Sequence, residues 1–343
     1  MGKIDDLVRK NIRELTPYSS ARDEYSGKEG IFLDANENPF GKLNRYPDPH
    51  HRRLRNEISR VNEIPVENIF VGNGSDEAID LLFRIFCEPG KDKALTFSPT
   101  YGMYEVSAAV NDVKMIKVPL NEDLDIDMAR VKPYLRDSRL KLIFICSPNN
   151  PTSNSFNREK ILSIIEEFRG IVVIDEAYID FSKNPSFISL INKHENLVIL
   201  RTFSKALGAA AIRVGMVFSG PEIISYLYRV KPPYNISTLN QKEALKRIKK
   251  PEKFRKQIED IKAEREILSE KVRNLEITEK LYPSDSNFLL VKVKDADAIY
   301  DLLTAKNIIV RNRSSVIKNC LRITVGTSEE NKKLIKELKK INI

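Results

Sequence analysis

Short apolar runs rich in β-branched residues alternate with longer amphipathic segments through the middle of the chain. Segments such as 75–86 and 157–168 have helical spacing behind a capping-type residue. Seven runs have the length and composition of strands: 69–72, 94–97, 114–118, 141–146, 171–174, 197–200 and 214–218. This alternation predicts an α/β fold in which a mostly parallel sheet is covered by helices on both faces. Ligands of such sheets bind beyond the carboxyl ends of the strands, so the following loops are where chemistry is expected.

The pattern changes after Pro232 and Pro233. A long charged helical stretch, 239–274, precedes the remaining predicted elements, which are strands at 287–293, 308–311 and 320–325 and helices near 295–305 and 328–340. These elements predict a smaller α+β domain at the carboxyl end. The predicted division is an amino-terminal arm (1–28) that joins the small domain, a large domain (29–233) and a small domain (234–343).

Composition places the chain among ordinary globular proteins. Its 343 residues are 41% hydrophobic and 31% charged, which excludes fibrous and disordered classes. No apolar run approaches the roughly 18 residues of a membrane span, and the amino terminus lacks the pattern of a secretory signal. The three cysteines form no CxxC pair, which fits a reducing compartment. We therefore expect a cytoplasmic protein with no membrane partner and no metal site.

The excess of positive charge is local. The chain carries 57 Lys and Arg against 48 Asp and Glu, for a net charge of +9. Residues 241–256 hold eight basic and two acidic side chains, and residues 331–343 hold five and one, so the two segments account for the excess. Both have Leu or Ile at helical spacing, which favours solvated helix faces over a nucleic-acid surface. A non-catalytic, nucleic-acid-associated protein is the alternative of another class.

Two loops that follow predicted strands carry candidate catalytic residues. Asp175 comes directly after the β-branched run 171–174, and Lys205 follows Thr202-Phe203-Ser204 after the next run. A lysine that forms a Schiff base must be partly desolvated so that its amine is available near neutral pH. The cofactor pyridoxal phosphate also needs a carboxylate beside its pyridine nitrogen. Asp175 at a strand end faces a site or a helix terminus, and Lys205 alone reads as a surface lysine, but the two together point to this chemistry.

A phosphate cradle for such a cofactor is available in the turn 72–77, Gly-Asn-Gly-Ser-Asp-Glu, which enters a predicted helix. An ordinary helix amino terminus explains this turn equally well. The loop Ser147-Pro148-Asn149-Asn150-Pro151-Thr152 places Asn150 where it could donate to a ring oxygen, although a Pro-Asn turn is the simpler reading.

These segments stand in a fixed order: GNGSDE, SPNNPT, VIDEAY, and TFSK followed by Arg213. Together they resemble the fold-type I pyridoxal-phosphate aminotransferases, with specific likeness to the histidinol-phosphate subgroup. The resemblance extends from LTPY (15–18) and DANENP (34–39) to CLRITVG (320–326). One departure is Ser153, which stands where the family turn carries glycine.

The resemblance implies a role for each matching residue. Lys205 would bind the cofactor aldehyde and move the substrate proton, Asp175 would pair with the pyridine nitrogen, and Tyr178 would contact the ring oxygen. The cofactor-binding residues that it implies are Ser75, Asp76, Tyr101, Asn150, Asp175, Tyr178, Ser204, Lys205, Arg213 and Tyr46. Tyr46 would reach across from a second subunit, so a homodimer is implied. For Tyr46 and Tyr101 a packing role is the alternative.

Substrate residues follow from the same resemblance. Arg322 and Arg311 match the arginines that bind the substrate anion, and Tyr18 would help to enclose it; Arg313 reads as a solvated charge at a strand end. The implied reaction moves an amino group between L-histidinol phosphate and 2-oxoglutarate, giving imidazole acetol phosphate and glutamate in histidine biosynthesis. An aromatic amino acid aminotransferase and a threonine-phosphate decarboxylase-like enzyme on the same fold are the alternatives.

Overall fold

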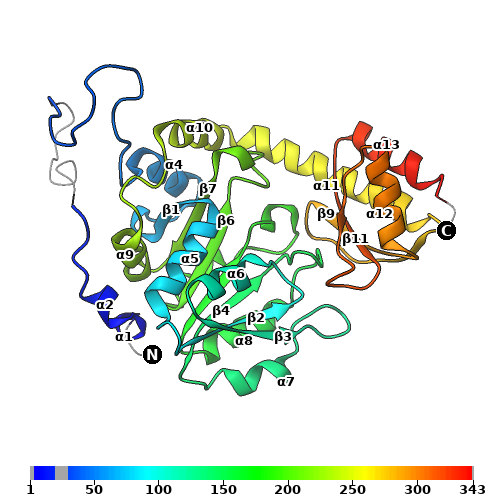
Figure 1. Ribbon diagram of the computed structural model, residues 1–343, viewed down its shortest axis with the longest axis horizontal. Helices are drawn as coiled ribbons and strands as arrows, with labels where there is room; N and C mark the ends of the chain where they lie inside the picture. The colour runs from blue at the N-terminus through cyan, green and yellow to red at the C-terminus, as the bar shows by residue number, and fades with distance from the viewer. Residues whose placement is uncertain (1–3, 20–29, 342–343) are drawn as a thin grey trace.

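Two β-sheets of unequal size organise the protein in the computed structural model, which describes residues 4–19 and 30–341 (Figure 1). A seven-stranded sheet forms the core of the larger unit, and a four-stranded sheet forms the smaller unit near the carboxyl terminus. A long helix, α11 (Pro251–Arg273), runs from one unit to the other.

The large sheet is mostly parallel, as predicted. Its strand order is β1-β7-β6-β5-β4-β2-β3, and β7 is antiparallel to both of its neighbours, while β6, β5, β4, β2 and β3 pair in parallel. The strands are β1 Ile69–Asn73, β2 Lys93–Ser98, β3 Lys114–Pro119, β4 Leu140–Cys146, β5 Ile171–Asp175, β6 Leu197–Thr202 and β7 Val214–Ser219. All seven predicted strands are confirmed.

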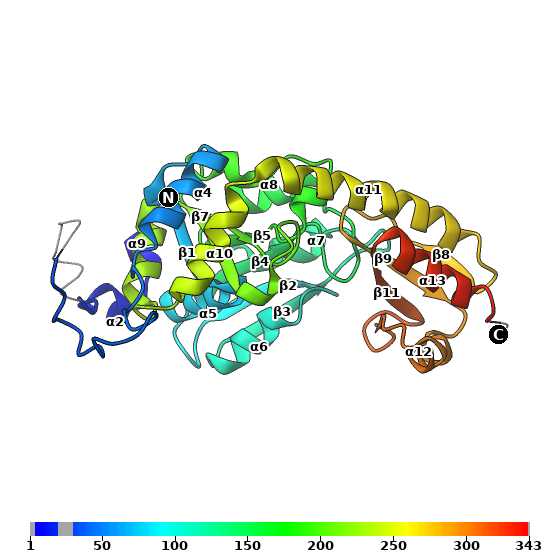
Figure 2. The ribbon, with the colours of Figure 1, turned by 90° about the horizontal axis from the view of Figure 1, so that it is seen from above.

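Helices cover both faces of this sheet because alternate side chains of each strand point to opposite sides. In β5, Val172 and Ile174 belong to one hydrophobic core, and Ile171 and Val173 to the other. Figure 2 shows α4 and α8 on one side and α5 and α6 on the other. Each fully buried Ile or Val contributes about 1.5–3 kcal/mol. The helices of this unit are α4 Arg52–Asn62, α5 Gly74–Phe86, α6 Met103–Val110, α7 Met128–Val131, α8 Arg158–Glu167, α9 Pro221–Val230 and α10 Thr238–Ile248.

Short 3₁₀ turns connect several of these elements. They are η1 Val66–Asn68, η2 Lys132–Tyr134, η3 Ile179–Phe181, η4 Phe187–Leu190 and η5 Ala210–Ile212. Among residues 4–19 and 30–341, no helix combines the length and hydrophobicity needed to cross a bilayer.

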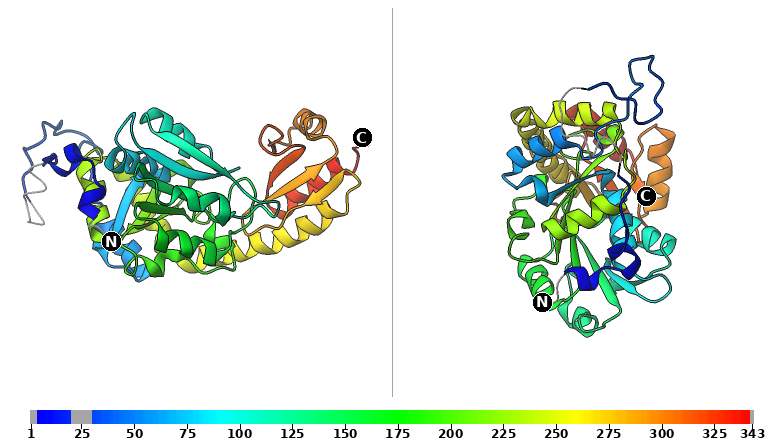
Figure 3. Two further views of the ribbon diagram at one scale, coloured as in Figure 1. Left: turned by 90° about the horizontal axis from the view of Figure 1, so that it is seen from below. Right: turned by 90° about the vertical axis from the view of Figure 1, so that its left-hand side faces the viewer.

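The small unit has an antiparallel sheet in the order β10-β11-β9-β8 and its own hydrophobic core (Figure 3). Its elements are β8 Thr278–Leu281, β9 Phe288–Val293, α12 Ala296–Ala305, β10 Arg311–Asn312, β11 Cys320–Thr324 and α13 Ser328–Leu338. The predicted strand at 308–311 is wrong for most of its length, because pairing is limited to Arg311 and Asn312. The pattern also missed β8, whose side chains are exposed or half-buried and give no apolar signal.

The helical stretch predicted at 239–274 is two helices, α10 and α11. Pro251 occupies the first turn of α11, where its missing N–H is harmless. In the interior of a continuous helix the same residue would remove a hydrogen bond and clash with the preceding turn. The break allows α10 to pack against α4 and β7 while α11 continues to the small unit.

The packing of the amino-terminal arm and of α10 indicates where the border between the two units lies. The described arm contains α1 Ile4–Leu7 and α2 Lys10–Arg13, and its buried Ile4, Val8 and Ile12 join the core formed by α5 and α9. These contacts, and those of α10, favour placing residues 4–19 and 238–248 with the large sheet. We propose a border inside α11 rather than at residue 233.

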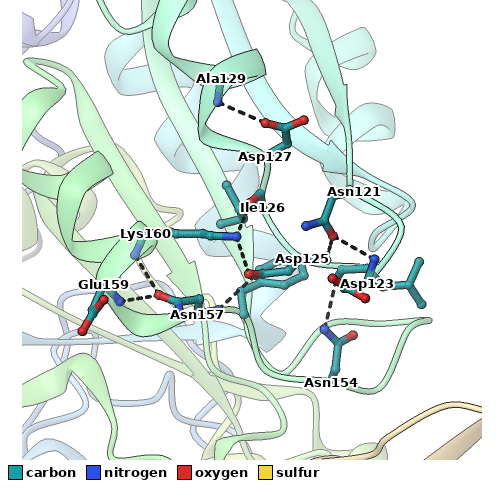
Figure 4. Close-up of polar contacts among 12 residues, drawn as sticks. Asn121, Asp123, Asp125, Ile126, Asp127, Ala129, Asn154, Asn157, Glu159 and Lys160 are labelled. Atoms are coloured by element: carbon teal, nitrogen blue, oxygen red, sulfur yellow. Dashed lines mark hydrogen bonds and ion pairs between the residues drawn. The ribbon is translucent and has the colours of Figure 1, made fainter.

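Polar contacts hold the loop that carries Asn150 where it enters α8 (Figure 4). Lys160 Nζ donates to Asp125 Oδ2 at 2.7 Å and to the Ile126 carbonyl at 2.8 Å, and Asn154 Nδ2 donates to the Leu124 carbonyl at 3.0 Å. Asn157 caps α8 by accepting from two backbone N–H groups. These contacts fix the loop between β4 and α8 at its α8 end.

The turn from β1 into α5 lies directly against β7. A Cβ atom on Gly215 would lie 2.3 Å from the carbonyl carbon of Gly74 and 2.4 Å from the backbone nitrogen of Ser75. Only glycine at 215 allows this approach, which sets the position of the first turn of α5.

We predict that Gly215→Ala lowers the free energy of unfolding by about 3 kcal/mol, because backbone atoms on both sides must move apart. Urea unfolding followed by circular dichroism measures this change. Gly102→Ala is the matched control, since its Cβ would meet nothing within 4 Å, and it should change stability by less than about 1 kcal/mol. Equal effects of the two substitutions would contradict the close approach.

Candidate active site

The candidate active site lies where the parallel strands β4, β5 and β6 end, facing the small unit (Figure 1). Asn150 follows β4, Asp175 is the last residue of β5, and Lys205 follows β6. Arg322 of β11 reaches across and donates to Asn150 Oδ1. Both sheets therefore contribute side chains to one site.

Asp175 is a buried carboxylate with two hydrogen bonds. Its side chain is 3% exposed, and it accepts from the Tyr104 hydroxyl at 2.7 Å and from the Ala177 N–H at 3.0 Å. Burial raises the pKa of Asp175 to about 6, and the two hydrogen bonds partly oppose that rise. A cationic group placed against this carboxylate would be strongly favoured, because it would restore the charged form.

Tyr104 is a site residue that the sequence did not reveal. It is fully buried on α6, stacks on Phe144 with ring centroids 4.9 Å apart, and directs its hydroxyl to Asp175. No local pattern marks it, because its partner lies 71 positions further along the chain.

Lys205 is partly desolvated. Burial and the nearby Arg322 lower the pKa of its amine, and Asp175 opposes this effect. Its Nζ lies 5.6 Å from the centroid of the Tyr178 ring. A lowered pKa increases the fraction of neutral amine, which is the form of lysine that attacks a carbonyl carbon.

An anion cradle lies at the amino terminus of α5. Gly74 opens the helix with φ +74°, and a Cβ there would lie 2.6 Å from Arg213 Nη2. Arg213 Nη2 contacts Asp76 Oδ2 at 3.2 Å, and Nη1 donates to Ser204 Oγ at 3.3 Å. The free N–H groups of the first turn, which includes Ser75, and the arginine offer donors and positive potential to a phosphate.

Aromatic side chains close the sides of the site. Tyr101 is half-buried, donates to Asp76 Oδ1 at 3.0 Å and packs edge-on against Tyr104. Tyr178 is buried and packs edge-on against Phe288 of the small unit, and burial raises the pKa of its hydroxyl.

The structure thus brings together most of the predicted site residues. Two predicted residues lie apart from this cluster within the single chain. Tyr46 is half exposed and stacks on Tyr234 with ring centroids 4.4 Å apart, and Tyr18 is 70% exposed. Arg311 is exposed and pairs in register with Arg322. The reading of Arg313 as a solvated strand end is wrong, because its side chain is half-buried.

Ser153 tolerates the backbone that the family turn gives to glycine, with φ at 68°. Its hydroxyl donates to the Pro283 carbonyl at 2.9 Å, and its own carbonyl accepts from the Asp285 N–H at 2.8 Å and from the Ser286 hydroxyl at 3.1 Å. These contacts offset the conformational cost and fasten the Asn150 loop to the strand connection of the small unit.

The site therefore combines a partly desolvated lysine, a buried carboxylate and an anion cradle at the carboxyl edge of a mostly parallel sheet. This combination suits a lysine that reacts with the carbonyl group of a phosphorylated ligand. The family model of aminotransferase class I and II matches residues 25–338. The chain belongs to the aminotransferase class I and II family.

Individual relatives agree with this assignment. The chain is 49% identical to the histidinol-phosphate aminotransferase of Christiangramia forsetii over 98% of both proteins, and 49% identical to that of Bacteroides fragilis over 99% of both. The solved structure of histidinol-phosphate aminotransferase from Clostridium acetobutylicum matches with a TM-score of 0.80 at 26% identity, covering 87% of this chain and 90% of that one. The Sinorhizobium meliloti enzyme in complex with pyridoxal-5'-phosphate has the same fold, with a TM-score of 0.79 at 22% identity over 89% of each chain.

We predict that Asp175 makes the unliganded protein less stable as pH rises. The folded-state pKa of about 6 exceeds the ordinary value of 3.8, so the folded state binds the proton more tightly than the unfolded state. Relative to Asp175→Asn, the wild-type protein should lose about 2 kcal/mol between pH 4 and pH 7. Urea unfolding across this range, on protein freed of bound ligands, measures the difference. A difference that does not vary with pH would contradict the raised pKa.

Proposed function

We propose that this chain is a pyridoxal-phosphate-dependent aminotransferase acting on L-histidinol phosphate. It transfers the amino group to 2-oxoglutarate, which gives imidazole acetol phosphate and glutamate, in histidine biosynthesis. The observation that carries the proposal is that Lys205 and Asp175 lie in one site. The same site holds an anion cradle and the arginines proposed to bind the substrate. Near-full-length identity of 49% to proteins named histidinol-phosphate aminotransferase supports the substrate.

The residues present fit the proposed cofactor. A glycine at 74, where any Cβ would crowd Arg213, leaves room for a phosphate at the helix terminus. Asp175, with its raised pKa, would hold a proton on the ring nitrogen, and Asn150 and Tyr178 would donate to the ring oxygen. When bound, pyridoxal phosphate supplies an aldehyde for the amino group and a ring that delocalises negative charge.

Lys205 is the residue suited to move the substrate proton. Burial and the nearby Arg322 lower the pKa of its amine, which increases the fraction of neutral amine that can accept a proton. Arg322 and Arg311 present neighbouring guanidinium groups to an anionic substrate. The tyrosines and Phe288 restrict water around the reacting atoms.

We also propose that the functional unit is a cytoplasmic homodimer. The segment before α4 extends away from the rest of the large unit (Figure 3). It exposes several large apolar side chains, which is unfavourable in water and suits a partner subunit. These residues include Ile31 at 91%, Leu33 at 88% and Phe40 at 83% exposure. Tyr46 lies at the end of this segment, so a second chain could receive it.

The basic helices give little support to a nucleic-acid role. Arg247 and Lys246 pair with Glu243, and Arg255 pairs with Glu252. In α13 and its end, Lys340 pairs with Glu337. Local ion pairs of this kind are those of a solvated helix face.

We predict that Lys205→Ala abolishes the amino-transfer half-reaction, because it removes the amine that lies near Asp175. The wild-type holoenzyme, mixed with L-histidinol phosphate and no keto acid, should lose the visible absorption band of its cofactor as the amino group is transferred. Lys205→Ala should show no such change on the time scale of wild-type turnover, a loss of at least about a thousandfold.

Lys193→Ala, at an exposed lysine outside the site, is the matched control and should react as wild type. Full activity in Lys205→Ala would overturn the catalytic assignment. A wild-type band unchanged by L-histidinol phosphate, together with release of carbon dioxide from a phosphorylated amino acid, would move the function to a decarboxylase.

We predict that Arg311→Ala raises the KM for L-histidinol phosphate by about ten- to hundredfold, because a charge-assisted hydrogen bond to phosphate is lost. The KM for glutamate should rise less. Steady-state kinetics with each amino donor measure the two values. An equal rise for both donors would show that Arg311 does not select the phosphate.

A further inference from the structure

Three arginines share one face of the small sheet. Arg311 on β10 stands opposite Arg322 on β11, so their side chains lie on the same side. Asn312, the next residue, points to the opposite side, where its amide donates to Asp297 of α12. Arg313 follows, and its N–H donates to the Cys320 carbonyl at 2.8 Å, which continues the pairing by one residue. The alternation of strand side chains therefore returns Arg313 to the face of Arg311 and Arg322.

This face looks toward the large unit. Arg322 donates to Asn150 Oδ1 and lies 5.3 Å from the centroid of the Phe288 ring, which packs on Tyr178. On the other side of β11, Leu321 and Ile323 belong to the hydrophobic core of the small unit. The arginine face is thus the side of the small sheet that borders the candidate active site.

The positive charge of Arg313 is not balanced within the described chain. Its guanidinium is half-buried, and its buried Nε finds no acceptor among residues 4–19 and 30–341. The neighbouring Ser314 hydroxyl is buried without a partner in the same part of the structure. Burial, Arg322 and Arg311 lower the pKa of Arg313, and no carboxylate opposes them. A guanidinium in this setting costs free energy unless an anion covers it.

We propose that Arg313 is a third anion-binding side chain of the substrate pocket, which acts with Arg311 and Arg322 on the phosphate of the amino donor. The inference rests on the proposed function for the identity of that donor. A phosphate dianion carries two negative charges and several acceptor oxygens, so it can satisfy more than two guanidinium groups. Arg322 already donates to Asn150, which leaves part of the phosphate to other donors.

The backbone around Arg313 is built to hold the side chain in place. The Arg313 carbonyl accepts from the N–H groups of Val316 and Ile317, both at 2.8 Å, so the loop after β10 folds back on it. Asn312 is fixed on both sides, because its Oδ1 also accepts from the Ser314 N–H at 2.9 Å. A fixed backbone lowers the entropy lost when the side chain binds an anion.

The test compares Arg313→Gln with Arg273→Gln, an exposed arginine at the end of α11 outside the site. Each holoenzyme is assayed with L-histidinol phosphate and with L-histidinol, which carries the same amine without the phosphate. Arg313→Gln should raise the KM for L-histidinol phosphate by about ten- to hundredfold with little change in kcat. The same substitution should leave kcat/KM for L-histidinol unchanged. Arg273→Gln should match wild type with both donors. Arg313→Lys should recover part of the affinity for L-histidinol phosphate, because lysine keeps the positive charge.

A second readout separates this inference from the proposed function. Inorganic phosphate is titrated into wild-type and Arg313→Gln holoenzymes, in which the cradle at α5 is already filled by cofactor. Weaker phosphate binding by Arg313→Gln supports the anion site even if the wild-type protein fails to turn over L-histidinol phosphate. That failure would contradict only the proposed function. Wild-type turnover combined with unchanged KM and unchanged phosphate binding in Arg313→Gln overturns the role of Arg313. An equal loss with both amino donors also overturns it, since it indicates a structural effect.

Discussion

The burial of a carboxylate at the end of β5 is the constraint on which the site depends. Asp175 is removed from water in a sheet covered on both faces, where an unpaired charge costs several kcal/mol. Tyr104 and the Ala177 N–H offset part of that cost, yet the pKa of the carboxyl stays at about 6. Burial thus leaves the charged form of Asp175 only partly compensated by its hydrogen bonds. A cationic ring nitrogen held against Asp175 would complete that compensation, which links cofactor affinity to the same burial.

The large sheet could be predicted from sequence because its signals are local. Most of its strands are buried on both faces and read as continuous apolar runs, and all seven strands were found, including the more exposed edge strand β3. The loop residues Asn150, Asp175 and Lys205 could be placed at one edge, since parallel strands end together. The turn that holds Asp76 had a local signal, but Ser204 and Arg213 became cofactor-binding candidates only through the family resemblance, because Arg213 contacts Asp76 across 137 positions of sequence.

Features that depend on long-range packing could not be predicted from the sequence. Tyr104 acts on Asp175 only because α6 packs beside α5 and β3, from where its side chain reaches Phe144 and Asp175, and nothing near residue 104 signals that partner. The break at Pro251 had a local signal that the charged periodicity on both sides obscured. Arg313 looked solvated because a strand of two residues leaves no apolar pattern from which to read its face. Its burial emerges from the pairing of β10 with β11 and from the loop that folds back on it.

The two units meet through contacts that differ in kind, and the difference bears on how the site works. Buried Arg265 of α11 donates to the carbonyls of Phe181 in the large unit and Ser286 in the small unit, and Ser153 adds hydrogen bonds to residues 283–286. These hydrogen bonds to neutral carbonyls join the two units at this part of the junction. At the candidate site the cationic groups are instead close to one another: burial and repulsion from Arg322 lower the pKa of Lys205, which Asp175 opposes, and burial and repulsion from Arg322 and Arg311 lower that of Arg313. An anion bound to the arginine face would offset this repulsion, so the same charges that cost free energy without an anion favour an anionic ligand.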